Sequence, residues 1–181
     1  VYNGNGNTGG STANSSHTYD TAKNLTANGF TKSYTVTFNA NSGTCSTASK
    51  NASYSFDGWA TTASGSVAYS NQQSVKNLTS TNGGKVNLYA KWSGGSVTLP
   101  TPTKTGYTFQ GWHTAASGGT KVGGAGASYT ATSNVTLYAQ WTLNSYTLTV
   151  NPNGGSWDGK TSNSTFTIAY GSTKAIANPT R

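Results

Sequence analysis

Ionisable and nucleophilic side chains are few and widely spaced in this chain of 181 residues. It holds three aspartates and no glutamate. General acid–base catalysis needs paired carboxylates or a tuned histidine within reach of the reacting atom. Asp20, Asp57 and Asp158 stand far apart, and the local sequence assembles no base, nucleophile and orienting group around any of them. We therefore predict no catalytic residue and no enzymatic activity.

Metal and cofactor chemistry has equally little support in the residue pattern. His17 and His113 each fall at a position where an internal copy of the same motif has a different residue. Cys45 is the single cysteine, so it cannot form an internal disulfide, and no metal-ligand spacing surrounds it. Calcium favours clustered carboxylates, whereas the stretch 151–160 offers only Asp158. We interpret that stretch as a turn and predict no metal and no cofactor.

Composition excludes two further classes of function. The net charge is +8, but the eleven cationic residues are scattered singly, which favours a solvated surface over a nucleic-acid site. No apolar run approaches the roughly 18 residues of a membrane span, so no membrane insertion is expected. Hydrophobic residues make up 33% of the chain and aromatic residues 12%. Because each aromatic side chain buries a large area, we expect several small cores between polar turns.

The elements that form these cores recur along the chain. An alternating strand followed by an Asn/Gly turn occupies 33–43 and 145–155, with a clipped copy at 1–6. Strict alternation is typical of a half-buried strand, with threonines on the outer face. The inner face of the two complete copies is expected to hold Tyr34, Val36 and Phe38, and Tyr146, Leu148 and Val150.

A second recurring module is a short strand, a turn and an extended exit rich in Thr and Pro, at 17–32, 95–104 and 166–181. Proline marks an extended linker or an edge because it has no N–H for a strand ladder. A single helical turn is conceivable in 71–80, and no longer helical period is present. The chain is therefore expected to be strand and turn with little or no helix.

The third module carries most of the aromatic residues. "YSFDGWAT" leads to "KVNLYAKW", and "YTFQGWHT" leads to "NVTLYAQW". Tyr107 and Phe109 share one strand face, whereas Trp112 has the opposite parity. A bulge or bend at Gly111 would return Trp112 to the core. The predicted structural core consists of Tyr54, Phe56, Trp59 and Trp92, and of Tyr107, Phe109, Trp112 and Trp141.

Residues outside that predicted core suggest where the chain meets water or a ligand. Positions that differ between the two copies should face water, namely Asp57 and Gln110, and Ala60 and His113. Tyr89, Tyr138 and Trp157 lie off the core faces or in a turn, so they could stack on sugar rings. A carbohydrate-binding module that uses these exposed aromatics is the alternative to a purely structural role.

"YTVTFNANSG", "LPTPTKTGYTFQGWHTAASGGTKV" and "VTLYAQW" together resemble the Listeria–Bacteroides repeat, the B-repeat type of internalin-like bacterial surface proteins. The match is specific over 93–142, good over 33–92 and 143–181, and weaker over 1–32. On this pattern, 1–32 is a partial repeat without the Trp half and 33–92 is a repeat unit. Residues 93–142 form the second half of a unit, and 143–181 the first half of another. Both ends are expected to cut a repeat.

The resemblance implies a mainly β fold of tandem, small, β-grasp-like mixed sheets in an elongated array. It also implies a structural or adhesive segment of an extracellular bacterial protein, attached to the cell surface or cell wall. The expected partners are neighbouring repeats of the same chain or of another copy, including head-to-tail self-association. A host or environmental glycan or protein is a further expected partner.

Overall fold

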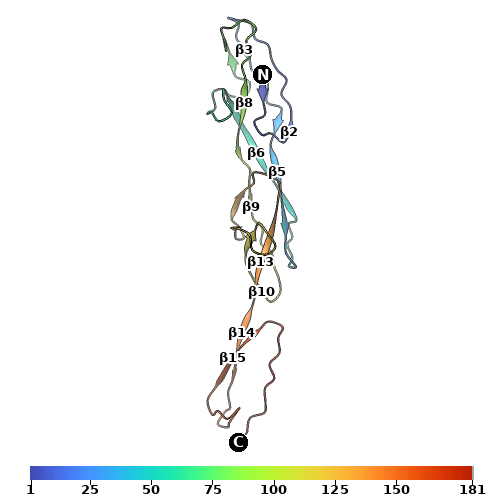
Figure 1. Ribbon diagram of the computed structural model, residues 1–181, viewed down its shortest axis with the longest axis vertical. Helices are drawn as coiled ribbons and strands as arrows, with labels where there is room; N and C mark the ends of the chain where they lie inside the picture. The colour runs from blue at the N-terminus through green and yellow to red at the C-terminus, as the bar shows by residue number, and fades with distance from the viewer. Residues whose placement is uncertain (181) are drawn as a thin grey trace. The chain divides into compact units, whose positions relative to one another are not determined.

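The computed structural model of the protein describes residues 1–180 (Figure 1). They form fifteen β-strands joined by turns. None of residues 1–180 is helical, so this part of the chain has no helix able to cross a membrane. The predicted mainly β class is confirmed, whereas the β-grasp-like and elongated-array details stay predictions.

The chain divides into two compact units that are discontinuous in sequence. Unit 1 contains Val1–Thr37, Ala48–Leu99 and Ala127–Thr136. Unit 2 contains Phe38–Thr47, Pro100–Gly126 and Leu137–Arg181, of which Arg181 lies outside the described residues. Segments far apart in the sequence therefore build each core.

Unit 1 contains a sheet with the strand order β1-β8-β6-β5. β6 pairs antiparallel with both β5 and β8, and β8 pairs parallel with β1. Three further two-stranded sheets are β2–β4, β3–β7 and β9–β12. The strands are β1 (Tyr2–Asn3), β2 (Gly9–Gly10), β3 (Lys23–Asn24), β4 (Phe30–Thr31), β5 (Ser33–Asn39), β6 (Ser49–Ala60), β7 (Ser74–Val75), β8 (Leu88–Gly94), β9 (Ser96–Thr98) and β12 (Ser128–Thr130).

The helical turn considered for 71–80 does not form. Residues 74–75 are the short strand β7 instead. Gln72 and Asn77 on either side of it have φ values of 56° and 54°. A right-handed helix does not tolerate such positive φ angles, so the backbone here follows turns and a strand.

Unit 2 contains a sheet with the order β13-β10-β11 and a separate hairpin formed by β14 and β15. β10 pairs antiparallel with both of its neighbours, and β14 pairs antiparallel with β15. The strands are β10 (Tyr107–His113), β11 (Lys121–Gly123), β13 (Val135–Leu143), β14 (Ser145–Val150) and β15 (Ser164–Ala169). The first two residues of β13, Val135 and Thr136, belong to unit 1. The last two residues of β5, Phe38 and Asn39, belong to unit 2.

A bulge interrupts both aromatic strands at the glycine before the tryptophan. The register of β10 shifts between Phe109 and Gly111, and that of β6 shifts between Phe56 and Gly58. The φ angle is +136° at Gly111 and +147° at Gly58, values that residues with a Cβ rarely adopt. The predicted bulge at Gly111 is confirmed. It lets Phe109 and Trp112 contribute to one core although their parities differ.

Candidate interaction surface

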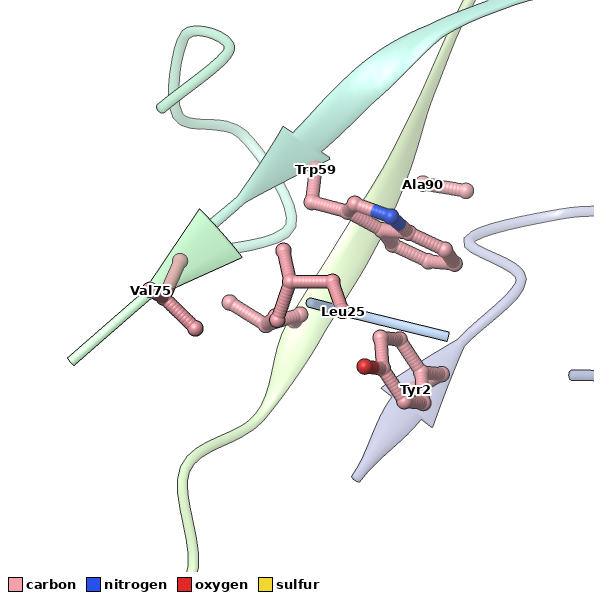
Figure 2. Close-up of a cluster of buried hydrophobic side chains, with 6 residues drawn as sticks. Tyr2, Leu25, Trp59, Val75 and Ala90 are labelled. Carbon is pink, nitrogen blue, oxygen red and sulfur yellow. The ribbon is translucent and has the colours of Figure 1, made fainter. Parts of the chain in front are cut away.

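Each Gly-Trp tryptophan covers the end of a strand that lies far away in sequence. Trp59 and Trp112 are fully buried. The Trp59 ring packs against Tyr2 with 4.8 Å between centroids (Figure 2), and the Trp112 ring packs against Phe38 at 5.1 Å. Tyr2 and Phe38 occupy the same position in their copies of the alternating strand, directly before an Asn/Gly turn. The same aromatic contact is therefore built once in each unit.

The second tryptophan of each hairpin fixes that turn through its indole N–H. Trp92 Nε1 donates to the Gly4 carbonyl at 2.9 Å, and Trp141 Nε1 donates to the Ala40 carbonyl at 3.0 Å. Gly4 and Ala40 again occupy the same position, two residues after Tyr2 and Phe38. Trp92 and Trp141 are only partly buried, so this hydrogen bond anchors rings that packing does not enclose.

A pair of asparagines ties each turn to its hairpin from the other side. Asn5 has a φ of 48°, and its side-chain amide donates to the carbonyls of Ala63 and Ala90, both at 3.0 Å. Asn41, with a φ of 50°, donates in the same way to Ala116 at 2.9 Å and to Ala139 at 3.1 Å. We call this arrangement the asparagine clasp.

The asparagine clasp was not predicted, although the sequence carried a signal for it. The Asn-x-Asn pattern occurs in the turn of all three alternating strands, at 3–5, 39–41 and 151–153. In each copy the first asparagine accepts the backbone N–H of the second, at 2.8, 2.9 and 2.9 Å. This Asx-type bond stabilises the left-handed conformation that aims the second side chain.

The remaining predicted core aromatics are partly buried. Phe56 and Phe109 bridge the two tryptophans of their hairpins, with centroid distances between 4.8 and 5.7 Å. A lysine lies over the ring of each tyrosine: Lys32 is 4.8 Å from the Tyr54 centroid, and Lys104 is 4.3 Å from that of Tyr107. These cation–π contacts occupy matching positions in the two units.

The expected exposure of the variable positions is partly wrong. Asp57 and Gln110 are exposed as predicted, and Asp57 accepts a hydrogen bond from Ser93. Ala60, however, is fully buried, and His113 is partly buried. The chain after β6 turns back, and the N–H groups of residues 68 and 69 both donate to the Trp59 carbonyl. This return covers the end of β6, including Ala60.

Trp157 cannot serve as the predicted sugar-stacking platform because it is only 6% exposed. Its Nε1 donates to the Ala177 carbonyl at 2.6 Å, and its ring packs edge-on against Phe166 at 5.6 Å. Tyr89 and Tyr138, the other two candidates, are partly buried residues of β8 and β13. They lie in different units, and stacking on a sugar stays a prediction for these two residues.

Unit 1 contains a cavity with a volume of about 510 Å³. Its wall includes a chain of polar groups in which Ser15 Oγ lies 2.9 Å from His17 Nε2 and 3.0 Å from the Tyr2 hydroxyl. Burial, and next the Lys23 ammonium, lower the pKa of His17. A serine beside a histidine is the first part of a nucleophilic site. Here no described residue accepts from His17 Nδ1 to orient the ring.

The other residues with reactive side chains do not assemble into a site. Asp20 forms an exposed ion pair with Lys76 at 3.3 Å, and Asp158 is exposed in its turn. The thiol of Cys45 donates to the Thr47 carbonyl. Within residues 1–180, no three His, Cys, Asp or Glu side chains come together in a group that could hold a metal.

Residues 145–180, which we call the C-terminal half repeat, contain the third alternating strand without a Gly-Trp hairpin. Among the described residues, β14 has only β15 as a strand neighbour. Tyr146 on β14 is 57% exposed. The turn after β14 nevertheless has the same geometry as the turns of the two complete copies, since Asn153 has a φ of 49°. Within the described residues this segment is therefore a two-stranded hairpin with an ordered turn.

The repeated pattern of strand, Asn/Gly turn and tryptophan hairpin places the chain in a class of small β repeats. The Listeria-Bacteroides repeat domain matches residues 47–91 and 80–140, which together cover just over half of the chain. The protein therefore belongs to the Listeria-Bacteroides repeat family.

Two curated relatives illustrate where such segments occur. Internalin H of Listeria monocytogenes serovar 1/2a is 53% identical over 53 residues, which is 29% of this chain and 10% of that protein. A "Putative Gly-rich membrane protein" of Evansella cellulosilytica is 32% identical over 134 residues, or 57% of this chain and 16% of its own length. The chain thus spans only a small part of these relatives. No solved structure matches the chain.

Proposed function

We propose that this chain is a structural repeat segment of an extracellular bacterial surface protein, where it spaces or supports an adhesive domain. The observation that carries the proposal is the duplicated scaffold. Trp59 and Trp112, the indole bonds of Trp92 and Trp141, and the asparagine clasp repeat the same contacts in both units. The buried contacts that stabilise the fold are the same in both units. The equivalent exposed residues Asp57 and Gln110, by contrast, differ in type.

The physical properties of the segment suit that role. The outward residues of β5 are Ser33, Thr35 and Thr37, all exposed, so the sheet presents small hydroxyl groups to water. With 8% charged residues, the fold depends little on ion pairs. In repeat proteins stability sums over units and their interfaces, so a long support can be built from small cores. Membership of the repeat family and the likeness to Internalin H support a surface location.

The test compares three forms of the surface protein that carries this segment, expressed in its own bacterium. One form is intact, one lacks the segment, and one has an unrelated rigid spacer of equal length in its place. The proposal predicts antibody labelling of the segment on intact cells, loss of adhesion on deletion, and recovery with the unrelated spacer. A segment that cannot be labelled on intact cells contradicts the proposal. Adhesion that the spacer fails to restore would instead assign ligand binding to the segment itself.

A further inference from the structure

We propose that Asn5 is a site of spontaneous deamidation which the folded unit 1 protects, and that its conversion prevents the asparagine clasp of that unit from closing again. Asparagine is a chemically labile residue, most of all before glycine, which has no Cβ to shield its backbone nitrogen. Asn5 is followed by Gly6. Such a modification site is separate from the proposed supporting role and does not depend on it.

The reaction needs water but no enzyme and no oxidant. The backbone nitrogen of Gly6 attacks the side-chain carbon Cγ of Asn5, and the new C–N bond closes a succinimide ring. The bond from Cγ to Nδ2 breaks, and Nδ2 leaves as ammonia with the proton of the Gly6 nitrogen. Water then opens the ring to aspartate or isoaspartate. Position 5 thereby loses an amide donor and gains a carboxylate.

The folded unit holds this amide in place. Asn5 Nδ2 donates to the carbonyl oxygens of Ala63 and Ala90, both at 3.0 Å. Ammonia leaves only after both hydrogen bonds break, so the folded state disfavours the reaction. A carboxylate at position 5 would face the same two carbonyl oxygens, and neither can donate a hydrogen bond to it. The clasp therefore opposes both the loss of ammonia and the closure of the product.

Conversion is expected to loosen the turn without unfolding unit 1. Two contacts of the same segment do not use the Asn5 amide: Trp92 Nε1 donates to the Gly4 carbonyl at 2.9 Å, and the Tyr2 ring packs on Trp59. Segments of a folded protein open locally at a lower cost than global unfolding. A segment that reacts while it is open returns to these two contacts but lacks the donor for the clasp.

Unit 2 contains the same clasp with a different residue after the asparagine. Asn41 Nδ2 donates to two carbonyls of its hairpin, and residue 42 is serine. Ser42 has a φ of 68° and Gly6 a φ of 80°, so the turn accommodates serine at this position. The Cβ of serine hinders attack by its own nitrogen. The two clasps therefore differ in chemical lifetime although their hydrogen bonds match.

The third copy of the turn supplies an internal reference. Asn153 also precedes glycine, and its φ is 49° against 48° for Asn5. Its backbone N–H donates to Asn151 as that of Asn5 donates to Asn3. Within residues 1–180, however, the Asn153 amide has no carbonyl partner. In this chain Asn5 and Asn153 thus share the dipeptide and the turn, and differ in the clasp.

The first experiment incubates the full chain at mildly alkaline pH, either folded or unfolded in guanidinium chloride. Mass spectrometry follows deamidation, and fragment ions distinguish Asn5 from Asn3, which also precedes glycine. Unfolded, Asn5 and Asn153 should react at similar rates. Folding should slow Asn5 at least about tenfold, as expected for two hydrogen bonds that must break, and Asn153 much less. No slowing at Asn5, or equal slowing of the two asparagines, would overturn protection by the clasp.

The second experiment tests whether conversion keeps the clasp open. The parent chain and Gly6→Ser are incubated unfolded, refolded, and compared by hydrogen exchange with their own untreated forms. A Cβ at position 6 would lie 3.6 Å from Lys32 Nζ, an ordinary contact, so the variant copies the turn of unit 2 without a clash.

Parent chains converted at position 5 should exchange faster at residues 2–5 and 88–92 than untreated chains. Gly6→Ser, which deamidates more slowly at this position, should regain its original protection. Full protection of the converted parent chain would contradict the inference. An equal loss of protection in Gly6→Ser would assign that loss to other asparagines and would also overturn it.

Discussion

Replacing Gly58 by alanine tests the bulge that brings Trp59 into its core. A Cβ at this position would lie 2.5 Å from Val67 Cγ1 and 2.7 Å from the Tyr69 carbonyl oxygen, at a φ of +147°. The Tyr69 oxygen is a backbone atom that accepts a hydrogen bond from the N–H of Trp59 at 2.8 Å. It therefore cannot move away from a Cβ without breaking that hydrogen bond. The Gly58→Ala substitution is therefore expected to strain or open the bulge.

The expected loss of stability follows from two contributions. The disfavoured backbone conformation costs about 1–3 kcal/mol, and the forced contacts add about 1–3 kcal/mol. The free energy of unfolding of unit 1 should thus fall by roughly 2–6 kcal/mol. With a urea dependence of about 2 kcal/mol per M, the unfolding midpoint would fall by about 1–3 M.

The assay is urea unfolding followed by tryptophan fluorescence, with Gly83→Ala as a matched control in the same unit. Gly83 also has a positive φ, +68°, but a Cβ there would meet nothing within 4 Å. The control should therefore show only the backbone cost of about 1–2 kcal/mol. Equal midpoints for the two variants would refute the reasoning, because close packing at the bulge would then contribute nothing.

The other predictions concern the asparagine clasp, the indole bond and His17. Asn41→Asp replaces an amide donor by a carboxylate that faces two carbonyl oxygens, so the free energy of unfolding should fall by about 2–3 kcal/mol. The control Asn153→Asp should change the urea midpoint little. Equal effects of the two substitutions would contradict the role of the asparagine clasp. Trp141→Phe removes the N–H that donates to a backbone carbonyl and should lower the free energy of unfolding by at least about 1 kcal/mol in the same assay. Because burial and the Lys23 ammonium lower the pKa of His17, the unfolded chain binds this proton more readily than the folded chain. The contribution of neutral His17 to the free energy of unfolding should be complete above a pH of about 6.5 and should fall as the pH drops below that value. His17→Gln should remove this pH dependence. The same pH profile of the thermal midpoint in the variant and the parent chain would refute the prediction.

Local features of the fold could be predicted because their signals lie within a few residues. Alternation in "SYTVTFN" indicates β5, and the parity conflict between Phe109 and Trp112 indicates the bulge at Gly111. In both cases the pattern of side chains along one strand determines which face is buried. Likewise the absence of an apolar 3.6-residue period fits a described chain without helix.

Long-range features could not be predicted from the same signals. The strand 33–43 directly precedes the hairpin of Trp59, yet its Phe38 packs on Trp112, while Tyr2 packs on Trp59. Both hairpins offer nearly the same residues, so local sequence does not indicate which one covers which strand. The sequence predicts an exposed Trp157 because a lone aromatic in a Gly-rich turn has no periodic pattern. Its burial depends on the exit residues near Ala177, twenty positions away.

Within this single chain, Tyr2 packs on Trp59 and Phe38 packs on Trp112, although each strand lies far in sequence from its tryptophan. Nuclear Overhauser contacts between these aromatic rings test that pairing most directly. The centroid distances of 4.8 Å for Tyr2–Trp59 and 5.1 Å for Phe38–Trp112 place ring protons of each pair in contact. We predict cross-peaks within both pairs in the intact chain. Cross-peaks between Phe38 and Trp59, with none between Tyr2 and Trp59, would contradict the account.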